Sequence, residues 1–105
     1  PADIQPLLTD LRAALENLYD DRLAQLVLYG SQARGDTHDE SDVDVIVVLD
    51  GPVQPGREIR RMSRVRTQLG LEYERALSLL PVSEADYRDR VSAWLQNVWQ
   101  EGVTL

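Results

Sequence analysis

Two aspartates separated by a single residue are the side chains best placed to hold a cation. Asp42 and Asp44 stand directly before the apolar run 45–49, which has the length and composition of a buried strand. Because strand side chains alternate between faces, the two carboxylates point the same way, roughly 6.6 Å apart along the backbone. Mg²⁺ is usually held by one or two carboxylates together with substrate phosphates. The pair therefore predicts a magnesium site at the rim of a core strand.

A Gly-Ser pair supplies the complementary chemistry for a phosphate. Gly30 and Ser31 follow a second apolar run, 26–29, and precede the Asp-x-Asp sequence. Glycine lets the backbone approach a phosphate closely, and Ser31 can cap a short helical turn that points free N–H groups at an anion. Arg34 either adds positive charge for the phosphate or pairs with a neighbouring acid. Each fragment alone is common in turns, but together they predict a phosphate held beside a metal ion.

The two motifs together resemble the signature of the DNA polymerase β-like nucleotidyltransferase superfamily. The stretches GSQARG and SDVDVIVV are similar to those of the minimal nucleotidyltransferases (MNT) of prokaryotes, which include the MntA-type antitoxins of HEPN/MNT pairs. The closing pattern of Asn97, Glu101, Gly102 and Val103 is also similar to the end of such domains. The resemblance covers most of the chain and implies a nucleotidyltransferase fold. We therefore expect an α/β (α+β) domain with a small mixed β-sheet flanked by helices.

The resemblance also implies roles for individual residues. Asp42 and Asp44 would be catalytic and bind Mg²⁺, and Gly30 and Ser31 would bind the phosphates of ATP. Arg34, on the ground of its charge alone, is a further candidate for binding the nucleotide. AMP would pass to a hydroxyl of an acceptor protein, which in the antitoxins is a tyrosine of the HEPN-domain toxin. The family has a third carboxylate on a later strand, which is expected here at 75–82. That segment contains Ser78 but no acid, as the printed sequence shows.

Glu72 and Glu74 precede this expected strand, and Glu74, the nearer of the two, is the candidate for the third acid. The alternative is that Glu74 is an exposed acid in the turn between helix and strand. Two functions therefore stay open. One is a Mg²⁺-dependent nucleotidyltransferase that moves AMP from ATP to a partner protein. The other is a weak or inactive nucleotide-binding antitoxin that acts by forming a complex.

Composition limits the class of protein and of partner. The chain has 105 residues, which predicts one domain spanning 1–105, and it contains no cysteine. No apolar run is long enough for a membrane span, and the first residues do not form a signal peptide, so we expect a cytoplasmic protein. The net charge of −7 argues against a nucleic-acid partner. An oligomer is compatible with the sequence.

Hydrophobic periodicity predicts the elements around the motifs. We expect an amphipathic helix over 4–18, strands ending at 29 and 49, a helix over 57–69 that Gly70 ends, and a strand over 75–82. Ser83 is expected to start the last helix. Its inward stripe comprises Val91, Trp94, Leu95 and Val98.

The central helix also carries a basic stripe opposite its apolar side. The stripe comprises Arg57, Arg60, Arg61 and Arg64. Such a stripe either docks an acidic partner or the phosphates of an acceptor, or forms a solvated face that balances nearby acids. The sequence leaves both interpretations open.

Overall fold

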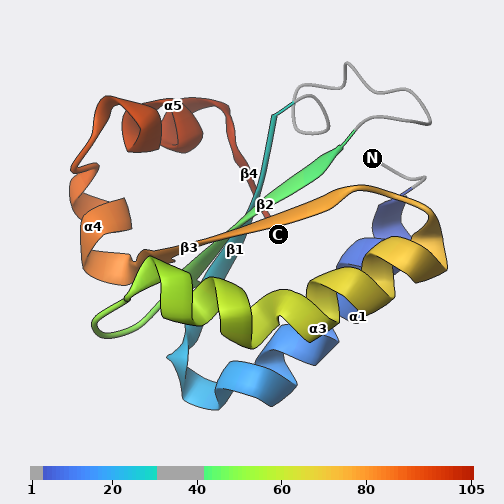
Figure 1. Ribbon diagram of the computed structural model, residues 1–105. Coiled ribbons are helices and arrows are strands. Elements are labelled where there is room, and N and C mark those ends of the chain that lie inside the picture. Colours follow the sequence, from blue (N-terminus) through green and yellow to red (C-terminus); the bar gives the residue numbers. More distant parts are fainter. Residues whose placement is uncertain (1–3, 31–41) are drawn as a thin grey trace.

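The computed structural model describes residues 4–30 and 42–105. Along the chain the elements are α1 (Gln5–Tyr19), the 3₁₀ helix η2 (Asp20–Arg22), β1 (Leu23–Tyr29), β2 (Val43–Leu49), α3 (Pro55–Tyr73), β3 (Leu77–Ser83), α4 (Glu84–Asp89), α5 (Ala93–Glu101) and β4 (Val103–Thr104). The strands form one mixed sheet in the order β3-β2-β1-β4 (Figure 1). β2 and β3 are parallel, whereas β1 is antiparallel to both of its neighbours. Among the described helices, none combines the length and hydrophobicity that a membrane crossing requires.

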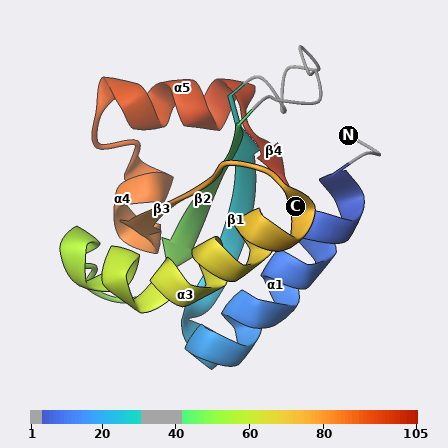
Figure 2. The ribbon, with the colours of Figure 1, turned by 45° about the vertical axis from the view of Figure 1, so that its right-hand side comes forward.

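The sheet separates two apolar cores. One face packs against α1 and α3, and the other packs against α4 and α5, so the fold has three layers (Figure 2). In β2, Val45 and Val47 belong to the first core, and Ile46 and Val48 belong to the second. Burial on both faces explains why this strand is a continuous apolar run rather than an alternating one. The predicted mixed sheet with flanking helices is confirmed.

The helix after β2 continues past its expected end. The pattern predicts an end at Gly70, but α3 runs to Tyr73, and Glu74 adopts the left-handed C-cap conformation with a φ of 54°. Leu69 and Tyr73 both pack on the first core, so tertiary contacts extend the helix beyond the glycine. Gly70 has a different role, because a Cβ there would lie 3.0 Å from the carbonyl oxygen of Arg75. It lets the chain fold back closely into β3.

The segment after β3 forms two helices rather than one. Ser83 starts α4 as predicted, and its hydroxyl oxygen accepts a hydrogen bond from the N–H of Asp86 at 3.1 Å. Arg90 then ends α4 in a left-handed conformation with a φ of 50°. Ser92 caps the new helix α5 by accepting from the N–H of Leu95 at 3.2 Å. The two serine caps therefore mark two separate helix starts.

This interruption changes which side chains face the sheet. Leu95 and Val98 are buried in the second core, as predicted. Val91 precedes α5 and is 65% exposed, and Trp94 is 40% exposed. The expected inward placement of these two residues is wrong, because the break between the helices shifts the phase of the hydrophobic stripe.

A buried acid connects the C-terminal end of α1 to the N-terminal end of α3, away from the start of β2. Glu58 is only 3% exposed and accepts a hydrogen bond from the hydroxyl of Tyr19 at 2.8 Å. Arg61 and Arg22 lie 3.4 Å and 3.7 Å from its carboxylate oxygens. Burial, followed by the hydrogen bond to Glu58, raises the pKa of Tyr19. Arg61, one member of the predicted basic stripe, is thus occupied within the chain.

Candidate nucleotide and metal site

Asp42 and Asp44 lie at the amino-terminal end of β2. Asp44 is the second residue of the strand and is partly buried, whereas Asp42 precedes the strand and is exposed. Two residues further along, Ile46 packs in the core beneath α4 and α5. Since alternate strand residues share a face, Asp44 points to the same side of the sheet. The partly buried carboxylate is therefore at a rim that a ligand can reach.

The electrostatics of the pair favour a bound cation. Burial raises the pKa of Asp44, and the charge of Asp42 raises it further. A divalent ion shared by both carboxylates would offset both effects. Within the described residues, no group of three or more histidine, aspartate or glutamate side chains is placed to share a metal ion. The two carboxylates fit a magnesium ion that takes its other ligands from phosphate and water.

Gly30 ends β1 directly beside this carboxylate. Tyr29 is the register partner of Asp44 in the antiparallel pair of β1 and β2. The next residue, Gly30, has a φ of 78°, which favours glycine, and a Cβ there would lie only 2.8 Å from Oδ2 of Asp44. Glycine is thus required both by the backbone conformation and by the space that Asp44 occupies. The predicted phosphate contacts of Ser31 and Arg34 lie outside the described residues.

The neighbouring parallel strand places a serine, not an acid, beside Asp44. Ser78 is the register partner of Asp44, and the N–H of Val43 donates to the carbonyl oxygen of Ala76 at 2.9 Å. Glu74 precedes β3 at the end of the strands where Asp44 lies, but it is exposed at the end of α3 and does not belong to β3. The position where a strand-borne third carboxylate would adjoin Asp44 is therefore occupied by Ser78.

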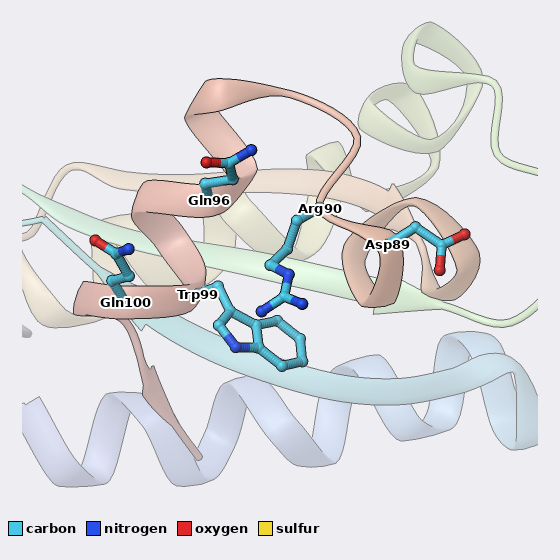
Figure 3. Close-up of a pocket in the computed structure, with 5 residues that line it drawn as sticks. All are labelled: Asp89, Arg90, Gln96, Trp99 and Gln100. Atoms are coloured by element: carbon cyan, nitrogen blue, oxygen red, sulfur yellow. The ribbon is translucent and has the colours of Figure 1, made fainter.

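A separate polar pocket lies between α4 and α5. Its volume is about 380 Å³, and it is lined by Asp89, Arg90, Gln96, Trp99 and Gln100 (Figure 3). The guanidinium of Arg90 lies over the ring of Trp99, 4.7 Å from the ring centroid. Figure 3 shows these two side chains next to each other. The lining does not include Gly30, Asp42 or Asp44, so this pocket is distinct from the candidate site.

The approach of α5 to β1 explains the glycine in the closing sequence pattern. α5 ends at Gly102, whose N–H donates to the carbonyl oxygen of Val98 at 2.8 Å. A Cβ at Gly102 would lie 2.5 Å from Cγ1 of Val27 and 2.6 Å from the carbonyl oxygen of Val98. The missing side chain lets the chain turn from α5 directly into β4.

Comparisons with known proteins agree with this architecture. Residues 8–97 match the family model described as "Nucleotidyltransferase domain". Two similar proteins of Methanocaldococcus jannaschii are both named "Putative protein adenylyltransferase". The first is 30% identical over 93 residues, a match that covers 88% of this chain and 87% of that protein. The second is 26% identical over 76 residues, which covers 72% of this chain and 76% of that protein. A crystal structure of "a putative nucleotidyltransferase" from Sulfolobus solfataricus has a similar fold, with a TM-score of 0.59 and 22% identity over 99% of this chain and 86% of that one. The chain therefore belongs to the nucleotidyltransferase domain family.

Proposed function

We propose that this protein transfers AMP from ATP to a hydroxyl group of a partner protein. The observation that carries the proposal is the placement of Asp44: a partly buried carboxylate beside Asp42, against the positive-φ turn at Gly30. The names of the two archaeal relatives support a protein as the acceptor. The transfer activity, the use of a magnesium ion and ATP as the nucleotide are all part of this proposal.

The reaction would be a displacement at the α-phosphorus of ATP. The oxygen of the acceptor hydroxyl forms a bond to that phosphorus, the bond to the bridging oxygen of the β-phosphate breaks, and pyrophosphate leaves. The hydroxyl proton is released to a base or to solvent. A magnesium ion on Asp42 and Asp44 would neutralise charge on the phosphates. Gly30 would let the backbone of the turn approach those phosphates.

The partner we propose is a HEPN-domain toxin, for which this chain would act as the antitoxin. This part of the proposal rests on the resemblance of the GSQARG and SDVDVIVV motifs to minimal nucleotidyltransferases. Modification of a hydroxyl on the toxin would then inactivate it.

The test is the intact mass of a co-expressed HEPN-domain protein after incubation with this chain, ATP and Mg²⁺. We expect the mass to increase by one or more AMP units, and we expect Asp42→Asn and Asp44→Asn to abolish the increase. Circular dichroism spectra of both variants provide the folding control. An unchanged mass, or equal activity of the aspartate variants, would contradict the proposal.

One observation favours a second candidate function. Ser78 stands beside Asp44 at the position of a strand-borne third acid, and the general base for the acceptor hydroxyl is therefore not evident among the described residues. The second candidate is an antitoxin that binds nucleotide and neutralises its partner by complex formation alone. A stable complex without any mass increase would support it.

A further inference from the structure

Among the residues that the structure describes, β3 is an edge strand, and it runs beside the candidate site. β3 is the last strand on one side of the sheet, as Figure 1 shows. The bond from Val43 to the carbonyl oxygen of Ala76 sets the parallel pattern, in which 76, 78, 80 and 82 direct their backbone groups toward β2. Leu77 and Leu79 therefore direct their N–H and C=O groups outward.

Only the end of β3 nearest Asp44 could pair with another strand. Pro81 is the next residue that faces outward, and proline has no N–H to donate. Within the ranges 4–30 and 42–105, no backbone hydrogen bond outside the regular elements involves Leu77 or Leu79. An added strand could therefore pair with Leu77 and Leu79 but not further along, which is how natural sheets limit edge pairing.

A groove runs between this edge and α3. Its volume is about 250 Å³, and its walls are Ile59, Met62 and Arg66 on α3 and residues 77–80 on β3. Ile59 is 44% exposed, so this wall of the groove presents a large apolar side chain to solvent. The groove can therefore accept an apolar side chain from a segment that pairs with β3.

The charge along α3 is opposite to that of the rest of the chain. The net charge is −7, yet α3 carries five of the eleven basic residues: Arg57, Arg60, Arg61, Arg64 and Arg66. Arg61 pairs with Glu58, but no ion pair involves the other four among the described side chains. Arg66 is the member that lines the groove. An occupant with acidic side chains would complement this charge.

We propose that the acceptor protein docks through an extended, acidic and apolar segment that adds a strand to the edge of β3. One apolar side chain would enter the groove at Ile59, and an acidic side chain would pair with Arg66. This inference rests on the proposed function and names the surface that would hold the acceptor.

The geometry gives this docking mode a path to Asp44. An added strand would lie two strand spacings from β2, roughly 10 Å away. Ser78 lies between them, in register with Asp44 and on the same face, and its side chain is short. A long hydroxyl-bearing side chain on the docked strand, such as tyrosine, would pass over Ser78 toward Asp44.

The test begins with a random octapeptide library displayed on phage and selected on the immobilised chain in 0.15 M NaCl without nucleotide. We expect enrichment of sequences that carry an apolar and an acidic residue two positions apart, because residues at that spacing lie on the same face of the added strand and can both reach α3. Arg66→Glu should exchange the acidic preference for a basic one, and Ile59→Ser should weaken binding of a selected peptide about fivefold to tenfold. Thermal melts confirm that each variant is folded.

Arg57→Glu is the matched control, because it makes the same charge reversal on α3 outside the groove. Arg57 and Arg66 are nine residues apart, or roughly 13 Å along the helix, whereas the Debye length at this salt concentration is about 8 Å. We expect Arg57→Glu to leave the charge preference unchanged. If both reversals have equal effects, a general electrostatic attraction and not the groove is responsible, and the proposal fails.

Hydrogen exchange locates the bound peptide. Strand addition should slow exchange of the Leu77 and Leu79 amides but not of the Ser78 and Leu80 amides, which already face β2. Protection at other residues, or no selected peptide, would overturn the proposal. If no peptide is selected and the chain instead binds a 20-nucleotide single-stranded RNA in a way that depends on Arg66, the proposal is likewise overturned.

Docking and transfer can fail separately. Alternating protection of the edge without AMP transfer to the partner would leave the docking surface in place and contradict the proposed function. AMP transfer to the partner with the same KM in wild type and Arg66→Glu would support the proposed function and overturn the docking surface.

Discussion

Gly30 and Gly51 offer a matched test of how the turn after β1 places Asp44. Both glycines have positive φ angles, 78° and 84°, so alanine should strain the backbone similarly at each position. The surroundings differ. A Cβ at Gly51 has no heavy atom within 4 Å, whereas a Cβ at Gly30 would lie 2.8 Å from Oδ2 of Asp44. Only the substitution at Gly30 must displace the carboxylate.

The expected costs follow from these contacts. A left-handed conformation costs a non-glycine residue about 1–2 kcal/mol, so Gly51→Ala should lower the free energy of unfolding by that amount. Gly30→Ala should cost about 1 kcal/mol more, because the Asp44 side chain must leave its preferred rotamer. For a domain of this size, each kcal/mol corresponds to a fall in Tm of about 4–8 °C.

Urea unfolding measures the stability, and titration with Mn²⁺ in the presence of a non-hydrolysable ATP analogue measures the site. We expect Gly51→Ala to bind Mn²⁺ like wild type. Gly30→Ala should bind it about tenfold more weakly, which corresponds to ~1.4 kcal/mol of lost carboxylate placement. Equal Mn²⁺ affinities for the two variants would refute the argument that the space at Gly30 belongs to Asp44.

Three further predictions test other parts of the structure. The pKa of Asp44 is raised in the folded state, so ionisation of this carboxyl group lowers the stability as the pH rises from the unfolded pKa through the folded one. In thermal melts without metal, Asp44→Asn should therefore have a higher Tm than wild type at pH 7, and the difference should vanish near pH 3. Ser78→Asp places a carboxylate in register with Asp44, roughly 5 Å away across parallel strands, so the Tm without metal should fall and the Mn²⁺ affinity measured by calorimetry should rise. An unchanged Mn²⁺ affinity would show that Ser78 does not face the site. Tyr19→Phe leaves the buried Glu58 without its hydroxyl donor and should lower the free energy of unfolding in urea by about 1–3 kcal/mol, whereas Mn²⁺ binding should not change, because this network lies away from the start of β2. A decrease of less than about 0.5 kcal/mol would contradict the assigned hydrogen bond.

Local signals in the sequence predicted much of the fold. Apolar runs bounded by glycine and aspartate indicated β1 and β2, and helical spacing of apolar residues indicated α1 and α3. The helix start at Ser83 is confirmed by its capping hydrogen bond. These features depend on neighbours within a few residues, so the sequence itself carries the information.

The errors occurred where long-range packing decides the outcome. Gly70 does not end α3, because Leu69 and Tyr73 pack on the first core. Val91 and Trp94 are exposed, because Arg90 interrupts the helix between them and Ser83. The predicted basic stripe also lacked Arg66, the arginine that lines the groove with β3, since nothing in the local spacing shows which side of α3 meets the sheet edge.

The sequence by itself determined the residues of the candidate site: an Asp-x-Asp pair at the start of a strand and a glycine at the end of another. Tertiary structure alone decided their relations. The register of β1 and β2 brings Gly30 against Asp44, and the parallel register of β3 brings Ser78 beside it. Strand register depends on contacts between residues far apart in the chain and on which face each strand buries, and a local pattern does not contain that information.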